Sequence, residues 1–189
     1  MKEISTWLVN KLERYLPSQP GMKEMLEYGI QLALYTITST IGLLLISLFM
    51  GMFVQGLIII FVFYVNQTVG GGFHADSHRK CFFTMSTGVV LGNVICKYFS
   101  LQCALFVFGA GSLGILLCFP VVLHSRKAFL KNRIPTYIKC SRICSILEII
   151  TGGILFQLWP TIFNAYVIGL FFSAVSRIYA SACSTSLPH

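Results

Sequence analysis

Long apolar runs separated by short polar segments make up most of this chain. Six of these runs approach the roughly 20 residues that a helix needs to cross a bilayer. The pattern therefore predicts an all-α integral membrane protein with about six transmembrane helices, in a single membrane domain over residues 1–189. The expected spans are approximately residues 29–49, 50–69, 82–99, 101–123, 143–162 and 164–182.

A more polar segment, residues 1–28, precedes the first span. Its apolar positions recur at helical spacing over residues 3–16, and Pro17 and Pro20 end the pattern. We expect an amphipathic helix that lies in the membrane interface or packs on the rest of the protein. The apolar stripe consists of Ile4, Trp7, Leu8, Leu12, Tyr15 and Leu16.

The composition agrees with membrane insertion. Hydrophobic residues make up 56% of the chain and charged residues 11%, whereas charged residues are about a quarter of a typical soluble domain. These values exclude a soluble enzyme, a nucleic-acid-binding module and a secreted domain. The net charge of +8 then points to cytoplasmic ends held near anionic lipids.

The distribution of Lys and Arg predicts the orientation. With the N-terminus inside, thirteen of the fourteen Lys and Arg residues fall on the cytoplasmic side, and only Lys97 lies outside. By the positive-inside rule, both termini and the segment 70–81 are therefore expected in the cytoplasm. Two further charges, Glu148 and Arg177, lie near the cytoplasmic ends of the last two spans. We expect them to face the bundle interior or to pair with one another.

The densest polar cluster follows directly after the second span, in the sequence Asn66-Gln-Thr-Val-Gly-Gly-Gly-Phe-His-Ala-Asp-Ser-His-Arg-Lys-Cys81. Its three consecutive glycines interrupt the helical pattern and permit positive φ angles. Functional residues often lie on such irregular segments between rigid elements. This segment is therefore the candidate site.

One interpretation is a cysteine nucleophile, Cys81, with His74 as its base. A thiol of pKa about 8.5 is only a few per cent ionised at neutral pH. Arg79, Lys80 and the start of the third span all favour its thiolate. Residues seven apart lie about 10.5 Å apart along a helix, whereas the hydrogen bond needs about 3 Å. This interpretation therefore requires a break or turn between about residues 75 and 80.

A second interpretation is a metal site. His74, His78 and Cys81 follow an i, i+4, i+7 pattern that would place three zinc ligands on one face of a continuous helix, with Asp76 or water as the fourth. A third interpretation is a polar hairpin with a buried thiol and solvated histidines. Spacing alone leaves all three open. A membrane metal-binding or transport protein is thus the alternative to an enzyme.

The motif Gly71-Gly72-Phe73-His74-Ala75 followed by Cys81 resembles the signature of the accessory gene regulator B family, bacterial membrane cysteine peptidases of quorum sensing. The size, six-span layout, N-terminal stretch and basic segment between spans four and five are also similar. The resemblance implies an enzyme of the bacterial plasma membrane that acts on a small precursor peptide at the cytoplasmic face. Such an enzyme cleaves off the C-terminal part of the precursor and supports closure of the rest into a thiolactone or lactone autoinducing peptide.

Carried over residue by residue, the resemblance assigns catalysis to His74 and Cys81, with no cofactor and no bound metal. Gly71 and Gly72 belong to the motif as supporting residues. Family members often have basic residues before the glycines, where this chain has Gln67 and Thr68, so no substrate-binding arginine is carried over there.

Other assignments rest on position in the sequence. Asn66, Gln67 and the Cys81 backbone N–H are candidate oxyanion donors, and Asp76 either orients His74 or is a solvated loop charge or helix cap. The basic segment from Arg126, with Lys127 and Lys131, is expected to contact anionic lipid phosphates or acidic residues of the precursor. Small residues in span four would allow close helix contact in a homodimer; these are Gly109, Gly111 and Gly114. No nucleic-acid partner is expected.

Overall fold

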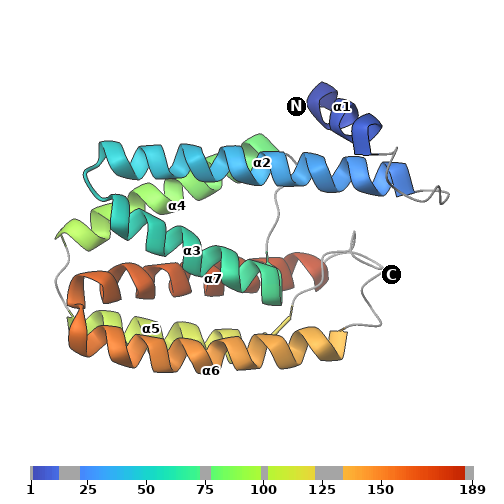
Figure 1. Cartoon of the computed structure of the whole chain (residues 1–189). Helices are drawn as coiled ribbons and strands as arrows, with labels where there is room; N and C mark the ends of the chain where they lie inside the picture. The colour runs from blue at the N-terminus through green and yellow to red at the C-terminus, as the bar shows by residue number, and fades with distance from the viewer. Residues whose placement is uncertain (1, 13–21, 73–77, 99–101, 122–133, 186–189) are drawn as a thin grey trace. The chain divides into compact units, whose positions relative to one another are not determined.

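The computed structural model describes residues 2–12, 22–72, 78–98, 102–121 and 134–185, and every regular element in these ranges is a helix (Figure 1). The all-α prediction is therefore confirmed for this part of the chain. Two compact units are formed by residues 1–42 and 43–189, and α2 contributes to both. The helices are α1 (Lys2–Leu12), α2 (Met22–Phe49), α3 (Phe53–Gly70), α4 (His78–Tyr98), α5 (Gln102–Cys118), α6 (Ile134–Leu158) and α7 (Pro160–Thr185).

The last six helices follow the six predicted apolar stretches in order along the chain. Four contain segments long and apolar enough to cross a membrane, namely Leu26–Phe49, Phe53–Gly70, Arg79–Tyr98 and Pro160–Ala182. In α5 the corresponding apolar segment, Val107–Cys118, is shorter. The chain is thus a membrane protein with several apolar helices, whereas the count of six crossings stays a prediction.

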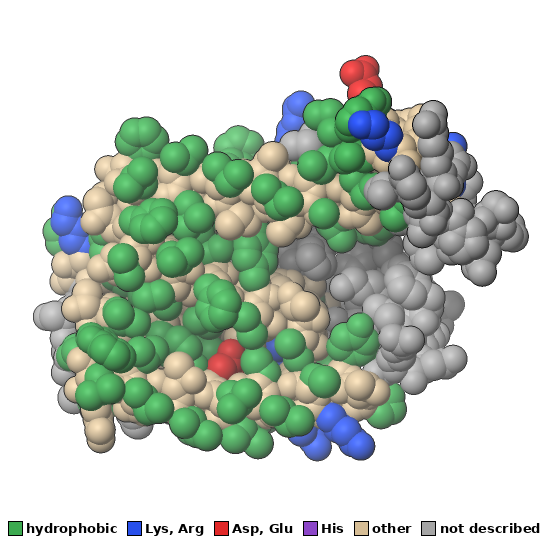
Figure 2. All heavy atoms as spheres, viewed as in Figure 1, with side chains coloured by type: hydrophobic (Ala, Val, Ile, Leu, Met, Phe, Trp, Pro, Cys, Tyr) green, Lys and Arg blue, Asp and Glu red, His purple; other side chains and the backbone are tan. Residues whose placement is uncertain are grey.

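Helix α6 has the reverse of the polarity that a soluble helix shows. Its buried residues are Ser141, Ser145 and Glu148, which share one face at i, i+4 and i+7. Most of its large apolar side chains are instead exposed, and Figure 2 shows hydrophobic side chains spread over the visible face of the helices. Soluble monomers rarely expose apolar patches of this extent, so this surface fits contact with lipid. The exposed side chains on α6 are Ile143, Ile146, Leu147, Ile149, Ile150, Ile154, Phe156 and Leu158.

Helix α7 is the central helix of the second unit and packs against α3, α4, α5 and α6. Eight consecutive residues, 163–170, are buried, which is expected only where neighbours surround a helix on all sides. Gly169 allows a close approach to α3: a β-carbon there would lie 2.8 Å from the β-carbon of Val62 and 3.2 Å from the carbonyl oxygen of Ile59. Close packing on α7 therefore fixes the course of α3.

Two tight connections follow from local chemistry. After α2, Gly51 has φ +69°, and Met52 N–H donates to Ser47 O while Gly51 N–H donates to Leu48 O, the bonds of a Schellman cap. A single residue, Trp159, separates α6 from α7. Pro160 is the first residue of α7, a position where the N–H that proline lacks would have no partner within the helix. The expected end of the fifth span, at residue 162, was therefore placed too late.

The N-terminal helix α1 covers the first turns of the segment predicted over residues 3–16. Ser5 and Val9 are buried, and Thr6 Oγ1 donates to Glu27 Oε1 of α2 over 2.8 Å. The apolar side chains of Ile4 and Trp7 are more than half exposed. Helix α2 is described from Met22, so the predicted boundary at residue 28 falls inside it. The interfacial role of α1 stays a prediction.

Candidate functional site

The candidate site begins where α3 ends, at the three glycines. The N–H of Gly71 donates to the carbonyl oxygen of Gln67 over 3.0 Å, and Gly71 has φ +72°, a left-handed conformation that other residues rarely adopt. The chain therefore leaves the helix at Gly71. His74 follows three residues later in the sequence.

The two neighbouring glycines make room for successive residues of α7. A β-carbon on Gly70 would collide with the guanidinium of Arg177 and would lie 2.8 Å from its Nε. A β-carbon on Gly72 would lie 2.7 Å from Ser176 Oγ and 2.6 Å from Gln67 Nε2. Gln67 Nε2 itself donates to Ser176 Oγ over 2.8 Å. The end of α3 is thus packed against one turn of α7.

Arg177 is almost completely buried, with 1% of its surface exposed. Its Nη1 lies 3.1 to 3.3 Å from four acceptors, which are the carbonyl oxygens of Leu116, Phe119 and Pro120 and the hydroxyl of Ser141. The three carbonyls lie at the C-terminal end of α5, where carbonyl oxygens lack partners within the helix. The negative end of that helix dipole therefore offsets part of the cost of burying the charge.

The other terminal nitrogen of Arg177 reaches α3. Its Nη2 donates to the backbone oxygen of Asn66 over 3.1 Å and to Asn66 Oδ1 over 3.2 Å. Asn66 Nδ2 in turn donates to Val62 O over 3.1 Å and to Glu148 Oε1. Within the described residues, Glu148 and Arg177 are thus both buried, as predicted, and Asn66 connects them.

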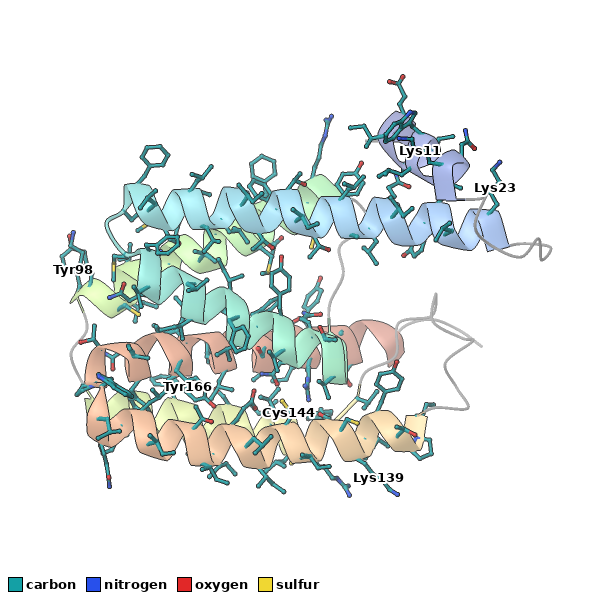
Figure 3. All side chains as sticks on the ribbon, viewed as in Figure 1. Lys11, Lys23, Tyr98, Lys139, Cys144 and Tyr166 are labelled. Carbon is teal, nitrogen blue, oxygen red and sulfur yellow. The ribbon has the colours of Figure 1, made fainter. Side chains whose placement is uncertain are left out.

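The carboxylate of Glu148 is held in a small polar region inside the bundle. Tyr166 Oη on α7 donates to the backbone oxygen of Glu148 over 2.7 Å, and the thiol of Cys144 contacts the carboxylate. Figure 3 shows Cys144 on the side of α6 that faces α7. Glu148 Oε2 is buried without a hydrogen-bond partner.

Cys81 is the fourth residue of α4 and is a partly buried cysteine. The next residue, Phe82, packs with Met85 against a core cluster that includes Ile59 of α3 and Ile168 of α7. Arg79 and Lys80 are exposed. The thiol is therefore in the first turn of a helix anchored to α3 and α7, and a helix N-terminus stabilises a thiolate.

Several predicted site residues lie outside the described part of the chain. They are His74, Asp76, Arg126, Lys127 and Lys131, together with the side chain of His78. A break in the helix before residue 78 would favour the catalytic pair, whereas a continuous helix would favour the metal site. Both interpretations of the site stay predictions. Among the described side chains, which do not include that of His74, no group of three His, Cys, Asp or Glu residues could hold a metal ion.

The predicted oxyanion donors on α3 have other partners. The side-chain amide nitrogens of Asn66 and Gln67 donate to Glu148 and Ser176, whereas the side-chain oxygen of Gln67, Oε1, is buried without a hydrogen-bond partner. The sequence analysis missed the connecting role of Asn66 and the contact of Gly70 with Arg177. The available signal was a polar Asn-Gln pair at the end of an apolar run, since polar residues inside membrane segments usually find partners.

Comparison with protein families identifies one match. A family model described as Accessory gene regulator B matches residues 2–181, nearly the whole chain. No curated protein and no solved structure matches. The matched range includes the glycines, Cys81 and the buried network around Arg177.

Proposed function

The chain belongs to the accessory gene regulator B family, and from this we propose that it is a membrane cysteine endopeptidase that processes a small precursor peptide. The observation that carries the proposal is the family match over residues 2–181, which includes the Gly-Gly-x-His motif and Cys81. The position of Cys81 in the first turn of a firmly packed α4 supports it.

In the proposed reaction, His74 takes the proton of the Cys81 thiol, and the thiolate attacks a backbone carbonyl carbon of the precursor. The C–N bond of the peptide then breaks, and His74 returns the proton to the departing amine. The C-terminal fragment leaves, and the retained part stays on Cys81 as a thioester.

Ring closure follows from the energy held in that thioester. A cysteine or serine side chain within the precursor attacks the thioester carbonyl, the C–S bond to Cys81 breaks, and the thiol recovers its proton. Forming a thiolactone directly from an amide is uphill, whereas exchange between two thioesters is nearly balanced. Water must be kept from the acyl-enzyme, and an apolar surrounding at the membrane edge would serve that purpose.

A processing assay tests this function. The chain is co-expressed in a bacterial membrane with an epitope-tagged precursor peptide of the family's kind that carries an internal cysteine, and the tagged products are separated by size. We expect Cys81→Ser and His74→Ala to abolish cleavage and His78→Ala to leave it largely intact. Equal loss in both histidine variants would contradict a Cys–His pair and favour the metal site.

A further inference from the structure

One side chain holds the ends of two helices beside the candidate site. Arg177 donates through Nη2 to Asn66 in the last turns of α3 and through Nη1 to carbonyl oxygens at the end of α5 and to Ser141 of α6. The side of the Gly70 α-carbon where a side chain would be attached faces the guanidinium directly, with no space for a β-carbon. The position of the end of α3 therefore depends on this guanidinium.

A second set of contacts between the end of α3 and α7 lies next to those of Arg177, at Ser176. Ser176 accepts a hydrogen bond from Gln67 and lies against the α-carbon of Gly72. Gly72 is two residues before His74. The backbone is thus held on α7 at Asn66, at Gly70 and at Gly72, on both sides of the turn at Gly71.

Joining helices through a buried charge carries a large cost in free energy. The desolvation of an ion costs several kcal/mol, and well-packed apolar residues often give equal or greater stability. What the guanidinium supplies instead is fixed direction, because its planar fork sets the angles of several hydrogen bonds at once. Direction matters here because a misplacement of about 1 Å at a reacting group can cost about 100-fold in rate.

We propose that Arg177 is a positioning residue for the His74–Cys81 pair, which sets the point and direction in which the chain leaves α3 toward His74. This inference rests on the proposed function. Arg177 acts through the backbone of α3 and not by touching substrate. Cys81 itself is carried by α4, so a change at Arg177 acts on the end of α3 that leads to His74 and not directly on the helix that carries the thiol.

The first test uses Arg177→Lys, which keeps the charge and loses the fork, and Arg177→Gln, which loses both. We expect kcat for processing of the tagged precursor to fall at least about tenfold in each, with little change in KM, since a change of about 1.4 kcal/mol is tenfold. The pH profile of Cys81 alkylation by iodoacetamide should shift toward that of His74→Ala. A loss of packing alone would lower the folded fraction without moving that profile.

The second test does not remove the buried charge and so guards against misfolding of the Arg177 variants. Gly70→Ala places a methyl group against the guanidinium, while Gly111→Ala places one on an exposed position of α5 with no atom within 4 Å. Gly70→Ala should reduce kcat and Gly111→Ala should not. The double variant Gly70→Ala with Arg177→Lys should lose less than the product of the two single losses, because both act on one contact.

The two proposals fail in different ways. Wild-type kcat and an unshifted alkylation profile in both Arg177→Lys and Gly70→Ala, in protein that processes the precursor, would overturn the positioning role alone. Processing that survives Cys81→Ser would overturn the proposed function. In that case the alkylation profiles still decide whether Arg177 affects the environment of Cys81.

Discussion

Replacing Asn66 by alanine should destabilise the folded protein by about 3 kcal/mol, because Asn66 connects two buried ionisable side chains. The variant loses the bond from Nδ2 to Glu148 and the bond from Arg177 to Oδ1. Hydrogen bonds to charged groups contribute about 1.5–3 kcal/mol each, whereas neutral bonds between membrane helices average only about 0.6 kcal/mol. Glu148 would keep only the weak thiol donor of Cys144. Arg177 keeps its other hydrogen-bond acceptors, so the total loss of stability is smaller than that of two bonds worth about 3 kcal/mol each.

The assay is equilibrium unfolding of the purified protein in mixed micelles, followed by tryptophan fluorescence. Thr68→Ala is the matched control: Thr68 lies on the same helix and is exposed, and its hydroxyl donates a hydrogen bond within that helix, to Tyr64 O. It should change the free energy of unfolding by less than about 0.5 kcal/mol. Combining Asn66→Ala with Glu148→Ala should cost less than the sum of the two single changes. An Asn66→Ala variant as stable as Thr68→Ala would refute the role of Asn66 as the connection.

Three further predictions concern the glycines and the thiol. Gly169→Ala should lower the free energy of unfolding by about 1–3 kcal/mol, since its methyl group meets Val62 and the backbone of α3. The control Gly111→Ala should be neutral or stabilise the protein by up to about 1 kcal/mol. Equal effects of the two changes in thermal unfolding would contradict the close packing of α3 on α7. Gly71→Ala should reduce precursor processing more than it reduces stability, because it strains a positive φ angle of +72° next to the site, and unchanged kcat would argue against that turn's importance. Incubation with EDTA should leave the rate of Cys81 alkylation unchanged, and a rise in that rate would indicate a bound metal.

The order and approximate ranges of the helices could be predicted from the sequence, because apolar runs of membrane length leave few alternatives. The boundary between α6 and α7 was placed a few residues too late because Trp159 and Pro160 interrupt the helix without interrupting the apolar run. Hydropathy carries no information on a break between two apolar residues. Proline as the first residue of the following helix was the signal that could have located it.

The polar interior was only partly predictable. The rarity of charges in the last two spans identified Glu148 and Arg177 as interior residues, which the structure confirms. Their connection through Asn66 was not predictable, because it depends on which faces of α3, α6 and α7 meet. Periodicity places a residue on a face of its own helix but does not identify the neighbour of that face. The roles of Gly70 and Gly72 depend in the same way on contacts with α7.

The central claim, that His74 activates Cys81 as a nucleophile, is tested most directly by alkylation without any substrate. The purified full-length protein is treated briefly with iodoacetamide at several pH values, and the modified cysteines are identified by mass spectrometry in the wild type, His74→Ala and His78→Ala. Cys81 should react fastest of the seven cysteines below pH 8, slow strongly in His74→Ala and stay fast in His78→Ala. A Cys81 that reacts at the same rate in all three proteins would contradict the claim.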